Sequence, residues 1–524
     1  MSTTVSVTTS PVTLGMDGNA SITINSGAAI GTIAFTSAND DVWPSFTASL
    51  QSKTFGPFGV AMSIVITVNQ ASITYQINGG TGGYSYDSSG NVTGLVGPGG
   101  VTIGVGGRQP KPTNTMTRKT FGVSSTSAGS TAYTYCQKEA LEAGFDAIRL
   151  VYHHHSATAP TLAAIVSATE TSKTDTADNL FEPIVGATKY QQKDSTTSAY
   201  GWRTVTWAGA TTKTLSADGA TQRPTLYTSD WIPLQSVARA SGEESTLPLV
   251  MLRCYVSNAA AQNFTVASAN SLMRTLTTDN TGRILQSGAY LGDGVGTISD
   301  ANRPGSLASS HIPFAIQYRT RTRGLSVIAI GDSITQSTPG ATDVMSSWVL
   351  RACALASTST KPVSAWNCGS ASQTGTTFTT AGNDALAIAG PNVVVYSAYT
   401  PNDYSSPTAA QMSYYVTQMM GRVQTMIDYC QTNRLALILW TGIPHSAGLS
   451  AAADAVRKSY NDALRAMATA QNVFLFDADA IVTDGASPAS MAAPYNLDNV
   501  HPSNAGIAAI ATGLSAVLNH IHVY

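Results

Sequence analysis

A single serine follows an apolar, strand-like run in the stretch IAIGDSITQSTPG, residues 328–340. The run ends at Gly331-Asp332-Ser333, a turn that ordinary apolar packing does not require. A serine hydroxyl is a poor nucleophile at neutral pH, so a catalytic Ser333 needs a histidine base that a third group orients. The alternative interpretation is a capping serine at a strand-to-helix turn.

The base is expected at His501. Of the eight histidines, it is the one in a loop after the last expected strand with a carboxylate close by, in Asp498-Asn499-Val500-His501-Pro502. The three-residue offset lets the Asp498 carboxylate reach Nδ1 of His501 while Nε2 faces outward. Pro502 and Ser503 then open the last expected helix. This matched base favours Ser333 as a nucleophile over Ser333 as a cap.

Two further residues are expected to stabilise an oxyanion. Gly369, in WNCGSASQTG, offers a backbone N–H, and Asn402, in AYTPNDY, offers a side-chain amide. Both would flank Ser333 in a doubly wound sheet of order 2-1-3-4-5. Asp332 is interpreted as structural, because Asp498 is the better-spaced carboxylate.

These four blocks resemble the SGNH (GDSL) hydrolase family over residues 324–524. The resemblance implies that Ser333 attacks, that His501 is the base and that Asp498 orients it. It also implies an oxyanion hole made by the Ser333 N–H, the Gly369 N–H and the Asn402 side chain. One departure is that Thr400 stands where the third block usually has glycine. The chain has no Gly-x-Ser-x-Gly, which argues against an α/β-hydrolase elbow.

The elements that must position these residues alternate in type from residue 324 onward. The expected strands are 325–330, 363–368, 392–399, 435–440 and 473–478, and helical periods cover 344–356, 409–430 and 451–470. A last helix carries Ile507, Ile510, Leu514, Val517 and Ile521. The order predicts a three-layer, flavodoxin-like α/β domain with a parallel sheet. Gly382-Asn383-Asp384 resembles the third block but precedes the third strand, and so lies at the wrong end of the sheet.

Two other domains are expected before residue 324, as a chain of this length should divide into about three. Residues 1–110 predict an all-β domain that closes in a glycine-rich linker, suited to attachment to a virion. Residues 111–323 predict a β-sandwich, accessory or carbohydrate-binding, with a short helix at AYTYCQKEALEAG, residues 132–144.

Several residues outside the four blocks have two interpretations. His445 follows the fourth strand and is either a substrate contact or a satisfied turn histidine. Trp202 and Trp207 point to opposite faces of one strand, so at most one fills the sandwich core and Trp202 is a candidate sugar contact. His153-His154-His155 has no accompanying carboxylate or cysteine cluster, so no metal is expected there. Arg319, Arg321 and Arg323 share one face, which is either solvated or suited to anionic sugars.

Composition excludes several classes of protein. Charged residues are 11% of the chain and the net charge is −2, which argues against nucleic acid as a partner. The five cysteines are widely spaced and predict buried small hydrophobes, not disulfides or a zinc site. We expect no cofactor, no standard secretion signal and no membrane insertion.

The sequence therefore predicts a serine esterase that hydrolyses acetyl esters on a polysaccharide. The Ser/Thr/Gly-rich texture and low charge favour a phage tail fibre or tailspike, which would act at the host cell surface. Its partners would be the O-acetylated polysaccharide, other tail proteins and, as is usual in that class, two further copies in a homotrimer. The alternatives are a non-enzymatic sugar-binding tail or adhesin protein, and an extracellular bacterial carbohydrate esterase unconnected with a virion.

Overall fold

The computed structural model describes residues 107–118, 133–154, 161–169, 203–216, 225–236, 247–257, 283–291, 314–337, 347–403, 406–447 and 449–523, with residue 159, the dipeptide 275–276 and short strands before residue 105. For those early strands, and for some strand residues of the middle region, only the backbone is described. Trp202 and His155 lie outside the described residues.

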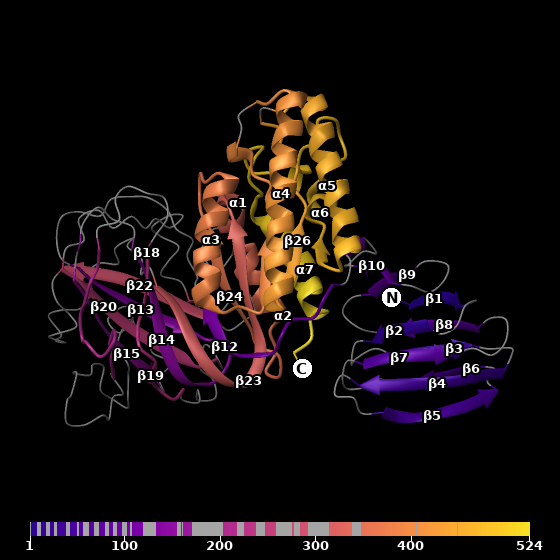
Figure 1. The fold of residues 1–524 in the computed structure, drawn as a ribbon, viewed down its shortest axis with the longest axis horizontal. Coiled ribbons are helices and arrows are strands. Elements are labelled where there is room, and N and C mark those ends of the chain that lie inside the picture. The colour runs from indigo at the N-terminus through magenta and orange to yellow at the C-terminus, as the bar shows by residue number, and fades with distance from the viewer. Residues whose placement is uncertain are drawn as a thin grey trace.

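Before residue 105, the described backbone is made of strands in three sheets (Figure 1). The first sheet has the order β1-β8-β3-β6 and the second β2-β7-β4-β5, and the third joins β9, β10 and β11. The strands are β1 (Ser2–Val7), β2 (Val12–Met16), β3 (Ser21–Asn25), β4 (Ala29–Ser37), β5 (Val42–Ser49), β6 (Ser52–Phe55), β7 (Met62–Thr67), β8 (Ile73–Asn78), β9 (Gly83–Tyr86), β10 (Val92–Val96) and β11 (Thr102–Gly104). An all-β N-terminal domain stays a prediction.

The segment after these strands is docked onto the C-terminal domain, although its composition suggested a flexible connector. Arg108 N–H donates to Asn472 O and Lys111 N–H to Arg434 O, at 3.0 and 2.9 Å. A Cβ atom at Gly107 would collide with the backbone of Phe474, so glycine permits this close approach.

Two sheets make up the middle region, and their buried side chains share one hydrophobic cluster. The seven-stranded sheet has the order β16-β15-β20-β13-β22-β21, with β17 paired to β15. Its strands are β13 (Tyr133–Ala140), β15 (Thr161–Thr169), β16 (Arg203–Thr204), β17 (Lys213–Thr214), β20 (Leu249–Val256), β21 (Thr275–Leu276) and β22 (Arg283–Leu291). Facing it are β12 (Thr113–Arg118), β14 (Phe145–His154), β18 (Thr225–Thr228), β19 (Ile232–Pro233) and the first half of β23 (Phe314–Gly331).

The helix predicted at residues 132–144 is wrong, because Tyr133–Ala140 is strand β13. This strand pairs along its length with β20 on one side and with β22 on the other. Two glutamates of this stretch are buried: Glu139 and Glu142 both form ion pairs with the buried Arg118. Long-range pairing and a buried charge cluster therefore override the local helical composition.

Strand β23 belongs to two domains at once. Its first half pairs antiparallel with β12 and β14, and its second half pairs parallel with β24 (Val363–Gly369) and β25 (Val393–Tyr396). The boundary that the sequence suggests at 323/324 falls inside this strand (Figure 1). The whole nine-stranded sheet is therefore mixed, whereas its C-terminal part is parallel.

The parallel part has the order β24-β23-β25-β26-β27, which is the predicted 2-1-3-4-5 arrangement. The last two strands are β26 (Ala436–Trp440) and β27 (Phe474–Phe476). The helices are α1 (Ser333–Gln336), α2 (Trp348–Ala356), α3 (Gly375–Ala389), α4 (Ala409–Asn433), α5 (Ala451–Gln471), α6 (Ala478–Val482) and α7 (Asn504–Asn519), with 3-10 turns η6 (Pro401–Asp403) and η7 (Ala493–Tyr495).

Helices cover both faces of this sheet. Val327 and Ala329 of β23 pack with side chains of α2 and α7, whereas Ile328 and Ile330 pack with α3, α4 and α5. Strand alternation sends successive residues to opposite faces, and both faces are apolar because both are covered. Ile521 lies just beyond α7 but is buried in the same cluster as Ile507.

Candidate active site

Ser333 is the first residue of α1, directly after β23. Asp332 caps this helix by accepting a hydrogen bond from Ile334 N–H at 2.9 Å. A Cβ atom at Gly331 would collide with the Thr335 hydroxyl, so glycine lets the strand turn sharply into the helix. The first N–H groups of a helix have no intrahelical acceptor, and the role of the Ser333 N–H as an oxyanion donor stays a prediction.

The structure brings together the three residues that the sequence proposes as a triad. Ser333 Oγ lies 2.9 Å from His501 Nε2, and His501 Nδ1 lies 2.9 Å from Asp498 Oδ2. With the ring proton on Nδ1 facing the carboxylate, Nε2 presents its lone pair to the serine hydroxyl. This geometry lets His501 take the serine proton as the hydroxyl attacks.

The Asp498 carboxylate is held in its charged form. Burial raises its pKa, but hydrogen bonds from the backbone and ring of His501 and from Val500 N–H outweigh that effect, so the pKa is lowered overall. Because folding lowers the pKa, the charged carboxylate stabilises the folded chain above an unfolded value of about 4. That contribution is lost as the pH falls through the folded value.

The loop that carries the base is fixed by its own hydrogen bonds. Leu497 N–H donates to His501 O at 3.0 Å, and Asn499 adopts a left-handed φ of 68° between them. Ser503 caps α7 by accepting from Gly506 N–H, as expected for a serine after the proline. A residue outside this loop also holds it, because Ser446 N–H donates to Asn499 O at 3.1 Å.

The two expected oxyanion donors follow the strands on either side of β23. In the parallel register Gly369 lies beside Gly331. Its N–H donates to Asn367 Oδ1 at 2.8 Å, and it would have to leave this acceptor in order to bind an oxyanion. A Cβ atom at Gly369 would collide with Gln336 N, so glycine is also needed for close packing against α1. The exposed Asn402 donates one amide hydrogen to Gln373 O at 3.1 Å, which leaves the other for a ligand. Both oxyanion roles stay predictions.

Thr400, which stands where the third block usually has glycine, connects this block to the first block through hydrogen bonds. Its buried hydroxyl donates to Asp332 Oδ2 at 2.5 Å and accepts from Asn402 N–H at 3.2 Å. Burial raises the pKa of Asp332, while the hydrogen bonds from Thr400 and Ile334 lower it in part. One hydroxyl therefore connects the cap of the helix that begins with Ser333 to the turn that carries Asn402, a link that the sequence alone did not identify.

We expect Thr400→Val to lower kcat on p-nitrophenyl acetate about 10- to 100-fold. The change keeps the shape of the side chain but leaves a buried carboxylate oxygen without its donor, at a cost of about 1–3 kcal/mol. Thr400→Ser keeps the hydroxyl and should restore most of kcat. Equal kcat in Thr400→Val and the wild type would show that this bond does not position the site.

His445 lies in the interior of the domain, with 3% of its surface exposed. Its Nε2 lies 2.9 Å from the Tyr399 hydroxyl, and burial lowers its pKa to about 4, so the ring is neutral at pH 7. This position favours the satisfied turn histidine over the substrate contact. Trp207 is also buried and packs in the cluster between the two middle sheets.

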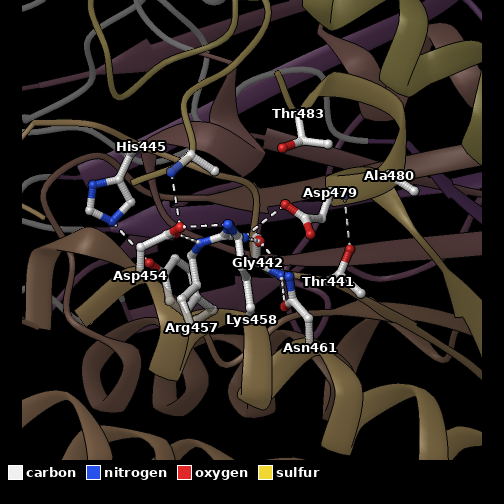
Figure 2. A network of polar contacts seen from close by, with 12 residues as sticks. Thr441, Gly442, His445, Asp454, Arg457, Lys458, Asn461, Asp479, Ala480 and Thr483 are labelled. Carbon is white, nitrogen blue, oxygen red and sulfur yellow. Dashed lines mark hydrogen bonds and ion pairs between the residues drawn. The ribbon is translucent and has the colours of Figure 1, made fainter. Parts of the chain in front are cut away.

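A buried charge network packs against the loop that follows β26 (Figure 2). Arg457 of α5 donates to Asp454 at 2.7 Å, to Asp479 at 2.8 Å and to the Gly442 carbonyl at 2.7 Å. Asn461 bonds both the N–H and the carbonyl of the same glycine. The network fixes the start of the loop that reaches Ser446 and, through it, the base loop at Asn499.

Arg457→Ala should destabilise the protein by about 3–5 kcal/mol, because it removes the buried cation that Asp454 and Asp479 share. Chemical denaturation followed by circular dichroism measures this directly. Lys458→Ala is the matched control, since Lys458 pairs with the same Asp454 at 3.1 Å but is 39% exposed. We expect it to cost less than about 1 kcal/mol. A similar loss of stability in both variants would mean that the buried ion pairs of Arg457 stabilise the protein no more than the exposed pair of Lys458.

Residues 329–509 match the model of the GDSL-like Lipase/Acylhydrolase family. The match contains Ser333, Asp498 and His501, the three residues that the structure brings within hydrogen-bond distance of one another. The C-terminal domain is a GDSL-like acylhydrolase domain. The protein is accordingly a serine ester hydrolase. No curated protein matches the chain with statistical significance.

Solved structures similar to this acylhydrolase domain include a GDSL-like lipase from Bacteroides thetaiotaomicron, with 18% identity, 37% of this chain and 86% of that chain covered, and a TM-score of 0.28. A member of the lipolytic G-D-S-L family from Veillonella parvula has 17% identity, covers 35% of this chain and 93% of its own, and has a TM-score of 0.25. A psychrotrophic esterase from Pseudoalteromonas has 14% identity, 35% and 91% coverage, and a TM-score of 0.27. Because these values are low, the assignment of the domain depends on the family model and on the triad.

The described residues hold no candidate site for a metal and no membrane-spanning helix. In that part of the chain, no group of three His, Cys, Asp or Glu side chains could hold a metal ion, and no helix is long and apolar enough to cross a membrane. Cys254, Cys353 and Cys430 are buried, as predicted, whereas Cys368 is half-buried. The backbone of His153 and His154 lies at the end of β14.

Proposed function

We propose that the acylhydrolase removes acetyl groups from a polysaccharide. The observation that carries this proposal is the shared strand β23, which runs without a break from the two-sheet region into the active site. A linker would let the two parts move separately, whereas a common strand holds the two-sheet surface in a fixed position relative to Ser333. Such a fixed surface suits a long polymeric substrate better than a small ester.

The reaction proceeds through an acyl-enzyme. Ser333 Oγ attacks the ester carbonyl as His501 Nε2 takes its proton, and the Asp498 carboxylate stabilises the resulting imidazolium. Collapse of the tetrahedral intermediate releases the sugar hydroxyl, which receives the proton from His501. Water, activated by the same imidazole, then frees acetate and regenerates the serine. Ser333 N–H, Gly369 N–H and the Asn402 amide are the proposed oxyanion donors.

The test measures acetate released from an O-acetylated polysaccharide and from p-nitrophenyl acetate by the wild type and Ser333→Ala. We expect both substrates to be hydrolysed by the wild type and neither by the variant. Hydrolysis of p-nitrophenyl acetate with no acetate from a panel of acetylated polysaccharides would retain the esterase and refute the polysaccharide substrate. If long-chain esters were then the better substrates, a lipase would be the better account.

We also propose that the chain is a phage tail protein that acts on the surface glycan of the host. Support comes from the low charge and the Ser/Thr/Gly-rich composition of the first 110 residues. A tail fibre of this kind would be a homotrimer and would contact other tail proteins. Light scattering on the full chain tests the trimer, and a monomer encoded away from tail genes would favour a bacterial carbohydrate esterase.

A further inference from the structure

Two arginines meet on one tryptophan at the outer face of the mixed sheet. The guanidinium carbon of Arg149 lies 4.8 Å, and that of Arg319 lies 4.2 Å, from the ring centroid of Trp231. Arg149 lies on β14 and Arg319 on the neighbouring β23, where it is paired with Ala147. Trp231 directly precedes β19, which pairs with β14 at the same level. Three strands therefore build this Arg149–Trp231–Arg319 cluster.

Among the residues that the structure describes, the two positive charges have no negative partner. Within the described part of the chain, neither guanidinium forms an ion pair with a carboxylate, and the one side-chain acceptor is the neutral Gln317, which bonds Arg149. The acid next to the tryptophan, Asp230, is bonded instead to Thr206, Ala208 and Gly209. Burial and the charge of Arg319 both lower the pKa of Arg149. An anion placed between the two would relieve this repulsion.

The cluster is open to a ligand and is held firmly. Arg319 is exposed, and Arg149 and Trp231 are half-buried. Gln317, which orients Arg149, donates to the carbonyls of Ile388 and Ala389 at 3.0 and 2.9 Å. Gln317 therefore holds the Arg149 guanidinium in place, while Arg319 lies over the Trp231 ring. Guanidinium groups bind carboxylate and phosphate oxygens through paired N–H donors.

Helix α3 links this cluster to the active site. Its C-terminal end carries Ile388 and Ala389, which bond Gln317, and its N-terminal Gly375 N–H donates to Asp403, next to Asn402, at 2.9 Å. A helix of 15 residues is about 22 Å long at 1.5 Å per residue. A ligand that touched both ends would be an extended chain of several sugar units.

We propose that the Arg149–Trp231–Arg319 cluster binds an acidic group, carboxylate or phosphate, on the polysaccharide whose acetyl esters Ser333 cleaves. The polysaccharide part of this inference rests on the proposed function, whereas the anion part rests on the cluster alone. The cluster would select acidic over neutral glycans and hold the polysaccharide while Ser333 cleaves its acetyl esters.

The test is binding by isothermal titration calorimetry with Ser333→Ala, so that no hydrolysis is involved. The probes are hexagalacturonate, which carries carboxylates, phosphorylated maltohexaose, and maltohexaose as the neutral chain. We expect one or both acidic probes to bind and the neutral one not to. Arg149→Gln and Arg319→Gln, each made in Ser333→Ala, should weaken binding about tenfold or more.

Arg321→Gln is the matched control, because it removes the same charge from an exposed position on the same face of β23 without touching Trp231. It should leave binding within about twofold, apart from a small salt-dependent loss. Equal weakening by Arg321→Gln and Arg319→Gln would show general surface charge only and overturn the proposal. So would equal binding of all three probes, or no binding of any.

A kinetic readout separates this proposal from the deacetylase. In the active protein, Arg319→Gln should raise KM for an O-acetylated acidic polysaccharide and leave kcat/KM for p-nitrophenyl acetate unchanged. If acidic glycans bind but are not deacetylated, the cluster stands and the proposed substrate fails. If neutral acetylated glycans are deacetylated as fast as acidic ones, the deacetylase stands and the cluster has no role in selecting the substrate.

Discussion

Replacement of Ser333 by alanine should lower kcat/KM on p-nitrophenyl acetate by roughly 10⁴-fold or more. The hydroxyl lies 2.9 Å from His501 Nε2, just beyond the carboxyl end of β23. Without it the acyl-enzyme cannot form, and only the slow attack of water at the remaining oxyanion donors is left. The melting temperature should change little, because the side chain loses a single oxygen.

The companion experiment is His501→Ala, alone and combined with Ser333→Ala. Residues that act as one unit give losses that do not add, so the double variant should be about as slow as either single variant. Multiplicative losses would instead mean that the two residues act in separate steps. A wild type no faster than Ser333→Ala on any ester tested would contradict the assignment of a serine hydrolase.

The sequence predicted the triad and the parallel sheet because both have local signatures. The expected strands of the acylhydrolase domain are short, mostly apolar runs. Ser333 and Gly369 stand at the carboxyl ends of two of them, and Asn402, Asp498 and His501 lie in segments after later strands, on the side of the sheet where ligands bind in this fold. The 2-1-3-4-5 order then brought distant segments to Ser333. Asp498 and His501 are three residues apart, so their contact needs no knowledge of the tertiary structure.

The features that the sequence did not predict depend largely on contacts between residues that are far apart in the chain. Strand β13 was assigned as a helix because the partners that make it a strand lie on β20 and β22, more than a hundred residues away. Helix α3 was not predicted, since its first turn, Gly375-Thr-Thr, has poor helix propensity and is stabilised by the cap at Thr374. The continuity of β23 was hidden because arginines interrupt its apolar pattern where that face meets solvent.

Single positions show the same limit. Thr400 is a departure from the usual glycine in the sequence, and only the position of Asp332, 68 residues earlier, explains it as a hydrogen-bonding bridge. Arg457 lies in a helical segment with ordinary surface composition, and its burial depends on Asp479 and on the Gly442 carbonyl. No pattern in the sequence indicates that Trp231 and Arg319 are in contact. Charges that are buried or gathered by tertiary structure are therefore the part that periodicity cannot predict.

The second large effect is expected at Asp498, where the two carboxylate oxygens have separate tasks. Oδ2 bonds the ring of His501, and Oδ1 accepts the backbone N–H groups of Val500 and His501 at 3.0 and 2.7 Å. Asparagine can keep the backbone bonds through its own Oδ1 but presents an N–H where the imidazole needs an acceptor. Asp498→Asn should therefore stabilise the wrong ring tautomer and lower kcat about 10²- to 10⁴-fold, with an almost unchanged melting temperature.

Asp498→Ala removes both the hydrogen bond to the ring and those to the backbone. Comparing it with Asp498→Asn separates the effects of the two. Asp498→Ala should lower kcat at least as far as Asp498→Asn, and it should also lower the melting temperature, because the loop from 496 to 502 loses the acceptor of two backbone N–H groups. The carboxylate is 43% exposed, so water can replace part of its charge, and the loss in Asp498→Asn should be smaller than in Ser333→Ala. If Asp498→Asn kept the kcat of the wild type, the orientation of His501 would have to come from the backbone of its loop alone, and Asp498 would be a loop cap that happens to touch the ring.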